Sequence, residues 1–304
     1  MKEKKYTLSI CLVTMNRAQQ LCEALKSCLA CQLPKETEFI IVDNASTDHT
    51  EEVVKTTLQE SGYAYYYEKL PENLGVGGGR NYAYGKAKGD AVYMMDDDAV
   101  IDFERNPDFF LHALSLMKQY DDIATLTTQI YDIVWEDNRV QNKGPAIAEG
   151  LYSCQMFCGG SHFLKKKVFP NMPYLNNRYG YEELPPSLRA VDLGKQNAFC
   201  PALLVIHKPA INKWDWTDEK NCELLVKGFA TSYAIKRMMY PFVFAPVLRL
   251  ATWRRIKKYG TQISNAEKRV WTMAKTICRE NPIEGKIKFS TVCRLIKDFK
   301  LSAF

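Results

Sequence analysis

Residues 91–101 read AVYMMDDDAVI, an apolar run that leads into three adjacent carboxylates and then becomes apolar again. A continuous apolar run is typical of a strand buried on both faces, and open α/β sheets bind ligands just beyond the carboxyl ends of such strands. Adjacent carboxylates repel one another, so a folded chain keeps them at a buried edge when a cation or several hydrogen-bond donors neutralise them. Asp96, Asp97 and Asp98 therefore favour a divalent metal site over the alternative, a solvated acidic turn.

Strands and helices alternate in the sequence before this stretch. Apolar, β-branched runs at residues 6–13 and 39–42 predict buried strands, and an alternating run at residues 63–68 predicts a third. Each is followed by a polar loop and then by a helical pattern, with cap residues available at the second helix start. This order predicts an α/β fold in which a Rossmann-like mixed sheet is flanked by helices.

Length and composition are those of an ordinary globular protein. The chain has 304 residues, of which 46% are hydrophobic and 25% charged, enough for one large domain and an appendage. Its ten cysteines follow no secreted framework, and the N-terminal apolar run is too short for a signal peptide or an anchor, so we expect a cytoplasmic protein. The spacing of Cys28 and Cys31 is that of redox or zinc-binding pairs, but the sequence has no second pair to complete a zinc site. We therefore expect these cysteines to be buried thiols.

A glycine-rich run opens the third predicted helix. Residues 75–81 read GVGGGRN, and glycines at a helix start let the backbone approach a phosphate or sugar closely, with Arg80 as an added donor. The run is not a dinucleotide fingerprint, because Arg80 stands where a third glycine is required and the run does not follow the first strand. A plain flexible turn is the alternative interpretation.

Polar residues also stand at two later element ends. Glu182 and Glu183 come just before Pro185 and Pro186, and because proline is favoured in the first helical turn, these acids would lie at a helix N-terminus. On residue type alone they are surface acids that complement the helix dipole. His207 ends an apolar strand, where a lone histidine is usually structural.

Four blocks of sequence carry a resemblance to a known family. They are SICLVTMNR at residues 9–17, VDNASTD at 42–48, NLGVGGGRN at 73–81 and MDDD at 95–98. In this order and at these separations they resemble the inverting family 2 glycosyltransferases with the A-type fold (GT-A). The resemblance continues through CGGS at 158–161, YEELPPSLR at 181–189 and VIHK at 205–208.

The resemblance implies a nucleoside-diphosphate sugar as donor. In the family, the first loop and the residue matching Asp43 hold the nucleotide base and ribose, and the acidic triplet binds ribose and a divalent metal. The residues predicted to bind the nucleotide sugar are Thr14, Asn16, Arg17, Asp43, Gly78, Arg80, Asn81, Asp96 and Asp97.

The resemblance also implies a metal site and a catalytic base. Asp98 would ligate Mn²⁺ or Mg²⁺, and His207 matches a family histidine that ligates the metal, which together give a mixed oxygen and imidazole site suited to Mn²⁺. The family has an acidic pair, commonly Glu followed by Asp, whose second member is the catalytic base. Here that member is Glu183, with Glu182 at the donor or at the helix end.

Positive charge gathers at the C-terminal end. Residues 249–304 contain 14 Lys or Arg against 4 Asp or Glu, although the net charge of the whole chain is +6. Apolar residues between the charges of residues 249–258 predict a basic amphipathic helix, which lies on anionic lipid or packs against the catalytic domain. We expect no nucleic-acid partner, because the tail lacks a recognition motif and an acidic cleft opposes a phosphate backbone.

Together these features predict a metal-dependent glycosyltransferase. We expect residues 1–212 to form the catalytic GT-A domain and residues 213–304 a helical, basic extension. The predicted reaction moves a sugar from a UDP or dTDP sugar to a hydroxyl of a glycan or lipid-linked acceptor, with inversion, in surface-polysaccharide or glycan biosynthesis. Residues 131–150 are expected to form an irregular loop beside the acceptor. The alternative is a catalytically silent carbohydrate- or nucleotide-binding partner of a glycosyltransferase complex.

Overall fold

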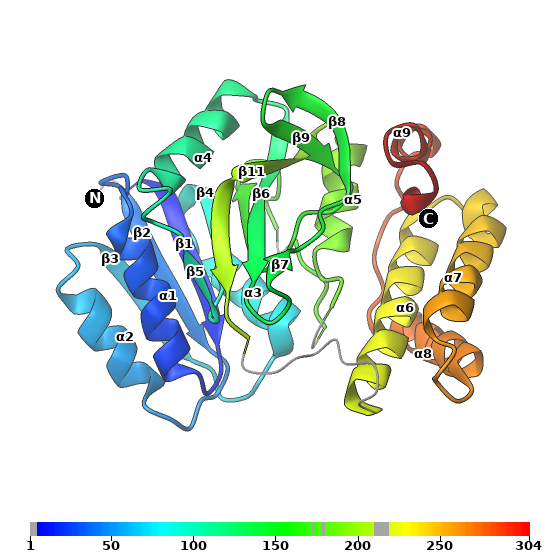
Figure 1. The fold of residues 1–304 in the computed structure, drawn as a ribbon, viewed down its shortest axis with the longest axis horizontal. Helices are drawn as coiled ribbons and strands as arrows, with labels where there is room; N and C mark the ends of the chain where they lie inside the picture. Colours follow the sequence, from blue (N-terminus) through cyan, green and yellow to red (C-terminus); the bar gives the residue numbers. More distant parts are fainter. Residues whose placement is uncertain (1–4, 172, 178–179, 210–218) are drawn as a thin grey trace.

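The computed structural model of the chain describes residues 5–171, 173–177, 180–209 and 219–304. Its first half is a run of parallel strands joined by helical crossovers, as the sequence predicts (Figure 1). The strands are β1 (Tyr6–Thr14), β2 (Thr37–Asp43), β3 (Ala64–Lys69) and β4 (Gly89–Asp96). The crossover helices are α1 (Ala18–Ala30), α2 (Thr50–Gln59) and α3 (Gly75–Lys86). The carboxyl ends of β1, β2 and β4 consequently meet at one edge of the sheet.

The later strands complete a mixed sheet in the order β3-β2-β1-β4-β10-β6-β11-β9-β8. β10 runs antiparallel to β4 and β6, whereas β11 runs parallel to β6. Two short strands pair outside this order, β5 with β11 and β7 with β6. The bounds of these strands are β5 (Ala99–Ile101), β6 (Ile123–Asp132), β7 (Asp137–Asn138), β8 (Lys143–Ala148), β9 (Leu151–Cys154), β10 (Ser161–Lys165) and β11 (Gln196–His207).

One element prediction is wrong in part. The segment 131–150, expected to be irregular, contains β7, β8 and the end of β6. β8 returns antiparallel onto β9 through a turn at Gly150, whose φ of 70° is the left-handed conformation that glycine adopts without strain. The polar composition of the segment concealed a hairpin whose strands are held by backbone pairing.

The central sheet is buried on both faces. On β4, Tyr93 packs beneath α1 and α4 (Phe109–Gln119), whereas Val92 and Met94 pack toward α3 and α5 (Leu184–Asp192). Successive side chains of a strand point to opposite faces, so a sheet covered on both sides needs apolar residues at every position. Cys28 and Cys31 are buried in the α1 layer of this core, as expected of structural thiols.

Helices follow the sheet in the C-terminal part (Figure 1). They are α6 (Glu219–Met239), η1 (Phe242–Phe244), α7 (Ala245–Tyr259), α8 (Ala266–Glu280), α9 (Phe289–Phe299) and η2 (Lys300–Ala303). Within the described ranges, no helix is both long and apolar enough to cross a membrane. The fold is therefore a mixed α/β sheet with a small helical, basic extension, as predicted. The expected boundary at residues 212 and 213 lies outside the described residues, so the division into domains stays a prediction.

Candidate active site

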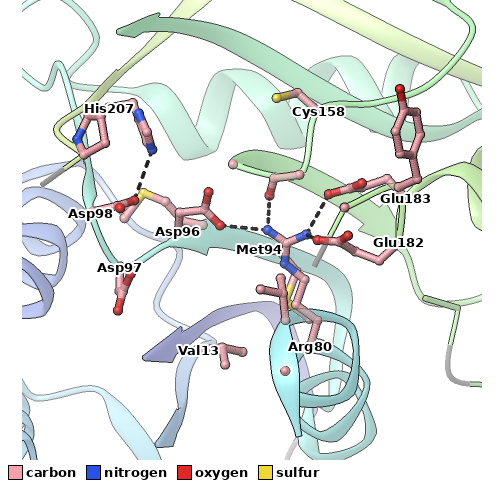
Figure 2. Close-up of a pocket in the computed structure, with 18 of the residues that line it drawn as sticks. Val13, Arg80, Met94, Asp96, Asp97, Asp98, Cys158, Glu182, Glu183 and His207 are labelled. Atoms are coloured by element: carbon pink, nitrogen blue, oxygen red, sulfur yellow. Dashed lines mark hydrogen bonds and ion pairs between the residues drawn. The ribbon is translucent and has the colours of Figure 1, made fainter. Parts of the chain in front are cut away.

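A cavity of about 640 Å³ opens at the carboxyl edge of the sheet. This volume lies in the range of small-molecule sites. Its walls come from the ends of β1, β4 and β11, from the loop before α5, and from Leu224, Gly228 and Phe229 of α6. The helical extension thus contributes one wall of the cavity. Figure 2 shows the acidic triplet on one side and the Glu182-Glu183 pair on the other.

The middle residue of the triplet is held by the loop after β1. Thr14 Oγ1 donates to Asp97 Oδ2 at 2.6 Å, and Arg17 Nη1 donates to Asp97 Oδ1 at 2.7 Å. The same Arg17 nitrogen donates to Asp98 Oδ2 at 2.8 Å. Burial outweighs these contacts and raises the pKa of Asp97 to about 6. Three of the residues predicted to bind the nucleotide sugar therefore form one connected group.

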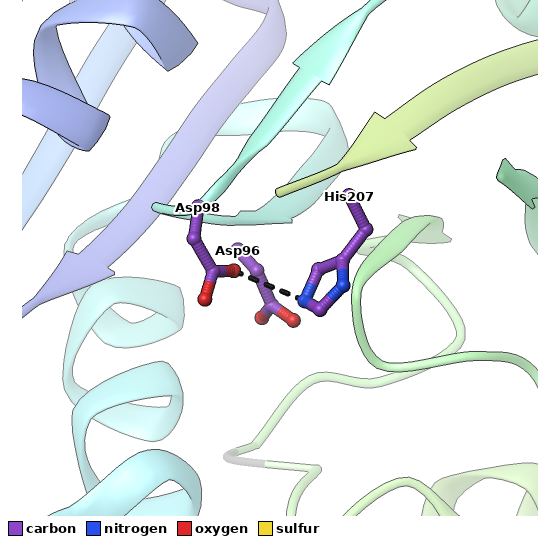
Figure 3. A group of neighbouring side chains, drawn as sticks. All are labelled: Asp96, Asp98 and His207. Carbon is purple, nitrogen blue, oxygen red and sulfur yellow. Dashed lines mark ion pairs between the residues drawn. The ribbon is translucent and has the colours of Figure 1, made fainter. Parts of the chain in front are cut away.

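Asp98 faces His207 at the end of β11 (Figure 3). Asp98 Oδ1 lies 3.2 Å from His207 Nε2, and Asp132 Oδ2 lies 2.9 Å from His207 Nδ1. Arg139 Nη2 is 2.8 Å from Nδ1 and 3.3 Å from Nε2. A donor in the ring plane, in line with the lone pair of one nitrogen, would be far from the other nitrogen. Arg139 therefore lies over the face of the His207 ring. We therefore assign the Nδ1 proton to the Asp132 contact, so that the Nε2 lone pair points toward Asp98.

The residues at this end of the cavity fit a divalent cation. Asp96, Asp98 and His207 each offer one ligand atom, and these atoms lie within 4.8 Å of one another. Carboxylate oxygens with one imidazole nitrogen suit Mn²⁺. Asp132, only 1% exposed, is the outer carboxylate that commonly fixes the tautomer of a ligating histidine. The sequence-based pair Asp98 and His207 is thus joined by Asp96, which the sequence had assigned to the nucleotide.

Arg80 occupies the centre of the cavity wall, between the two acidic groups (Figure 2). Its Nη2 donates to Asp96 Oδ1 at 2.7 Å and to the carbonyl oxygen of Gly159 at 2.8 Å. Its Nη1 donates to Glu182 Oε1 at 3.0 Å and to Glu183 Oε1 at 2.7 Å. Because the Arg80 side chain is only 6% exposed, these contacts are largely shielded from water.

The pKa values of two carboxyl groups around Arg80 are shifted in opposite directions. Burial raises the pKa of Asp96, but the positive charges of Arg80 and Arg139 outweigh burial and lower it below its usual range. Burial and the negative charge of Glu182 raise the pKa of Glu183 to about 8, although Arg80 opposes them. One cavity therefore holds a carboxylate kept ionised beside a carboxyl group poised to exchange a proton near neutral pH.

The glycines after β9 make room for the Arg80 contacts. A Cβ at Gly159 would overlap Glu183 Oε1 and lie 2.7 Å from Arg80 Nη1. A Cβ at Gly160 would lie 3.2 Å from Asp96 Oδ2. The ion pairs of the protein itself therefore require that side chains be missing at these two positions.

Four of the residues predicted to bind the nucleotide sugar do not line the cavity. Asp43 accepts from the Ser46 backbone and the Tyr67 hydroxyl, and its side chain is buried. The others contact neighbouring loops: Asn16 bonds Thr47, Gly78 approaches Asn176 and Leu74, and Asn81 bonds the backbone of Tyr174. Their roles at the nucleotide stay predictions, and the glycine run packs α3 against its surroundings.

Three residues of the site come from the segment 131–150, which was expected beside the acceptor, but the sequence assigned none of them an individual role. Asp132 and Arg139 lie at the end of β6 and just after β7, and Trp135 between them lines the cavity with 37% of its surface exposed. A signal for Asp132 was present, because it follows the apolar run of β6 directly, as the triplet follows that of β4. Arg139 had no such signal, since its place depends on the short β7 hairpin.

Comparison with known families decides the class of the protein. The family model described as "Glycosyl transferase family 2" matches residues 9–170, more than half of the chain. The chain belongs to glycosyltransferase family 2. The match covers the four sequence blocks, the acidic triplet and the glycines after β9, and ends before the Glu182-Glu183 pair.

Relatives of this family 2 chain match part of its length. A protein named an uncharacterized glycosyltransferase, from Nostoc sp., is 34% identical over 93 residues, which is 31% of this chain and 28% of that protein. An uncharacterized protein from Haemophilus influenzae is 29% identical over 99 residues, or 32% of this chain and 53% of that protein. The match thus spans about a quarter of the first relative and half of the second.

Solved structures match nearly the whole chain. Residues 1–349 of TarS from S. aureus, in complex with UDP-GlcNAc, give a TM-score of 0.67 at 13% identity, covering 98% of this chain and 89% of that one. The mannosyltransferase PcManGT from Pyrobaculum calidifontis, in complex with GDP-Man and Mn²⁺, gives 0.58 at 15% identity, covering 96% and 79%. At these identities the likeness shows the GT-A fold, extension included.

Proposed function

We propose that this glycosyltransferase moves a sugar from a UDP or dTDP sugar to a hydroxyl of a glycan or lipid-linked acceptor, with inversion at the anomeric carbon. One observation carries the proposal: the cavity holds three potential metal ligands at one end and the Glu182-Glu183 pair at the other, with Arg80 between them. A donor diphosphate requires the first and an acceptor hydroxyl the second. The nucleotide sugars in the structures of TarS and PcManGT support the donor class.

The donor end is formed by Asp96, Asp98 and His207, which we assign to Mn²⁺. When bound there, the ion would offset negative charge on the departing diphosphate. The chain itself orients this end. Asp132 holds the His207 ring through Nδ1, and Arg17 fixes the carboxylate of Asp98.

The acceptor end is assigned to Glu183. The acceptor oxygen attacks the anomeric carbon, the bond from that carbon to the diphosphate oxygen breaks, and the hydroxyl proton passes to a carboxylate oxygen of Glu183. One such displacement inverts the configuration. Arg80 holds Glu183 Oε1 in place, and the raised pKa of Glu183 makes its carboxylate a stronger base than an ordinary one.

We further propose that residues 1–212 and 213–304 are the catalytic domain and the helical extension, and that the acceptor belongs to surface-polysaccharide or glycan assembly. The α6 residues that line the cavity support an extension that lies beside the acceptor. This assignment makes the extension part of the active enzyme.

The purified protein is tested for transfer from a panel of UDP, dTDP and GDP sugars with Mn²⁺, and the anomer of the product is determined by NMR. We expect turnover with a UDP or dTDP sugar and an inverted product. A retained anomer would contradict direct displacement. Tight nucleotide binding without turnover on any acceptor tested would support the silent partner instead, and an absence of nucleotide binding would remove both functions.

A further inference from the structure

Helix α7 packs on its neighbours with one face only. Leu248, Thr252 and Ile256 follow one another at a spacing of four residues, and all three are buried among the C-terminal helices. Residues at that spacing lie on one side of a helix, so the intervening residues point away from this contact. Figure 1 shows α7 at the outer edge of the molecule, with α6 between it and the sheet.

The outward side of α7 and the η1 turn before it expose large apolar side chains. Phe242 is 70% exposed, Val243 63%, Leu250 47% and Trp253 38%. Val247 joins them at 41%. Apolar groups gathered in this way on one face mark an interaction site, whereas scattered single ones do not.

The same side of α7 is also basic. The helix has five Lys or Arg and no Asp or Glu. Arg254, Lys257 and Lys258 are exposed there, whereas the Arg249 guanidinium lies over the Trp271 ring of α8, 4.8 Å from its centroid. Among the ion pairs of the described ranges, Lys257 reaches Glu267 at 3.7 Å, whereas Arg254 and Lys258 reach no carboxylate. Within these ranges, the exposed apolar side chains are therefore interleaved with two cations that lack an anionic partner.

We propose that this surface, hereafter the α7 face, docks on an anionic lipid bilayer. It comprises Phe242, Val243, Val247, Leu250, Trp253, Arg254 and Lys258. A bilayer fits the face because Trp and Phe favour the membrane interface, aliphatic side chains enter the acyl boundary, and Lys and Arg pair with headgroup phosphates. A convex single helix with bulky apolar residues between cations matches a planar anionic surface better than an acidic protein groove.

The α7 face extends the proposed function without depending on it. Sugar transfer needs the cavity, and the cavity is lined by α6, against which α7 packs. Docking through α7 would hold the cavity beside the bilayer, which favours a lipid-linked acceptor. Lipid binding and nucleotide binding are measured separately, so the failure of one does not imply the failure of the other.

Flotation of the full chain with lipid vesicles tests the docking. Binding should increase as phosphatidylglycerol replaces phosphatidylcholine and decrease as salt screens the surface. Arg254→Glu with Lys258→Glu should weaken binding by about 30-fold or more, since each cation near an anionic surface contributes about fivefold. The matched control is Lys26→Glu with Lys118→Glu, two exposed lysines of α1 and α4 that change the net charge equally and should leave binding nearly as it is.

A second pair of variants tests the apolar part. Leu250→Ser with Trp253→Ser should lower vesicle binding at high salt, whereas Phe103→Ser with Leu111→Ser should not. The control residues are similarly exposed, at 41% and 39%. Thermal melting and UDP affinity of every variant check that the fold and the cavity are intact.

Four results would overturn the proposal. The first is equal vesicle binding by the α7 variants and their controls, and the second is binding that ignores phosphatidylglycerol. The third is a dimer in sedimentation that Leu250→Ser with Trp253→Ser dissociates, without vesicle binding by the wild type, which would assign the α7 face to a second copy of the chain. Capture of an acidic protein in place of vesicles would contradict the proposal in the same way.

Discussion

The two acidic groups of the cavity are assembled in different ways. Asp98 and His207 are brought together by the sheet, because β5 pairs with β11 at Ala99 and His207, and the backbone nitrogen of Lys208 donates to the Asp98 carbonyl at 2.7 Å. Glu183 is 103 residues from Arg80 in sequence, and the link between them in the cavity is a side-chain ion pair. The proposed metal end is thus fixed by backbone pairing and the proposed base end by one guanidinium.

This difference predicts that replacing Arg80 lowers the stability of the fold more than replacing Arg17 does. Arg80→Met would leave Asp96, Glu182 and Glu183 without their shared cation in a shielded site, and we expect the free energy of unfolding to fall by about 3–5 kcal/mol. Urea denaturation measures the loss. Arg17→Met is the matched control at the metal end, where the Arg17 side chain is 34% exposed and the loss should be smaller. Equal losses of unfolding free energy in the two variants would show that both ends of the cavity depend on their arginine to the same extent.

The metal end should control nucleotide affinity. Asp98→Asn removes a charged ligand and should abolish the Mn²⁺-dependent part of UDP affinity, and His207→Ala should weaken it. Titration calorimetry with and without Mn²⁺ gives both values. Asp90→Asn, on the same β4 strand at its exposed opposite end, is the control and should bind like the wild type. If Asp98→Asn and His207→Ala both retain the Mn²⁺ effect, the ion binds elsewhere.

Asp132 should have a smaller effect on the same property. Asp132→Asn removes the carboxylate that orients His207, and loss of such an outer group typically lowers metal affinity about 10- to 100-fold. Titration of Mn²⁺ followed by electron paramagnetic resonance measures the affinity of the protein without nucleotide. An unchanged affinity would leave Arg139 or the sheet itself as the element that positions the ring.

How far the sequence could predict the site follows from the same comparison. The triplet was found because polar residues that directly follow a buried strand gather at one sheet edge, and no side-chain geometry was needed. His207 was found only through the family resemblance, because a lone histidine at a strand end is usually structural. The contact between Arg80 and Glu183 could not be found, because it depends on how the loop before α5 folds back onto α3. The fit of Gly159 against Glu183 was hidden for the same reason.

The fold shows a similar division. Long apolar strands such as β1 and β4 were predicted close to their bounds, whereas the β8 and β9 hairpin was missed within a polar segment. A short hairpin is held by backbone hydrogen bonds and a turn at Gly150, and its residues Lys143–Ala148 carry little apolar periodicity. The family resemblance predicts a base at Glu183, where the residues alone indicate surface acids.

Ionisation of Glu183 should determine how the rate of sugar transfer depends on pH. Because the carboxylate of Glu183 must be ionised to accept a proton, kcat/KM should fall as the pH drops below about 8. Glu182→Gln removes the neighbouring negative charge, which should lower the pKa of Glu183 and move this fall to lower pH. Rate profiles of the wild type and the variant, at saturating Mn²⁺, measure the displacement. A profile that moves to higher pH, or does not move, would contradict the assigned coupling.

The central claim is that one end of the cavity binds the donor through the metal and the other end accepts the proton. The UDP–Mn²⁺ affinity of Glu183→Gln tests this claim most directly. Glutamine preserves the shape of the side chain and an oxygen for Arg80, but it cannot accept the proton. We predict an affinity within about twofold of the wild type, together with a turnover at saturating donor that is lower by about 10²- to 10⁴-fold. A parallel loss of affinity and turnover would show that Glu183 belongs to the binding site and that the two ends do not act separately.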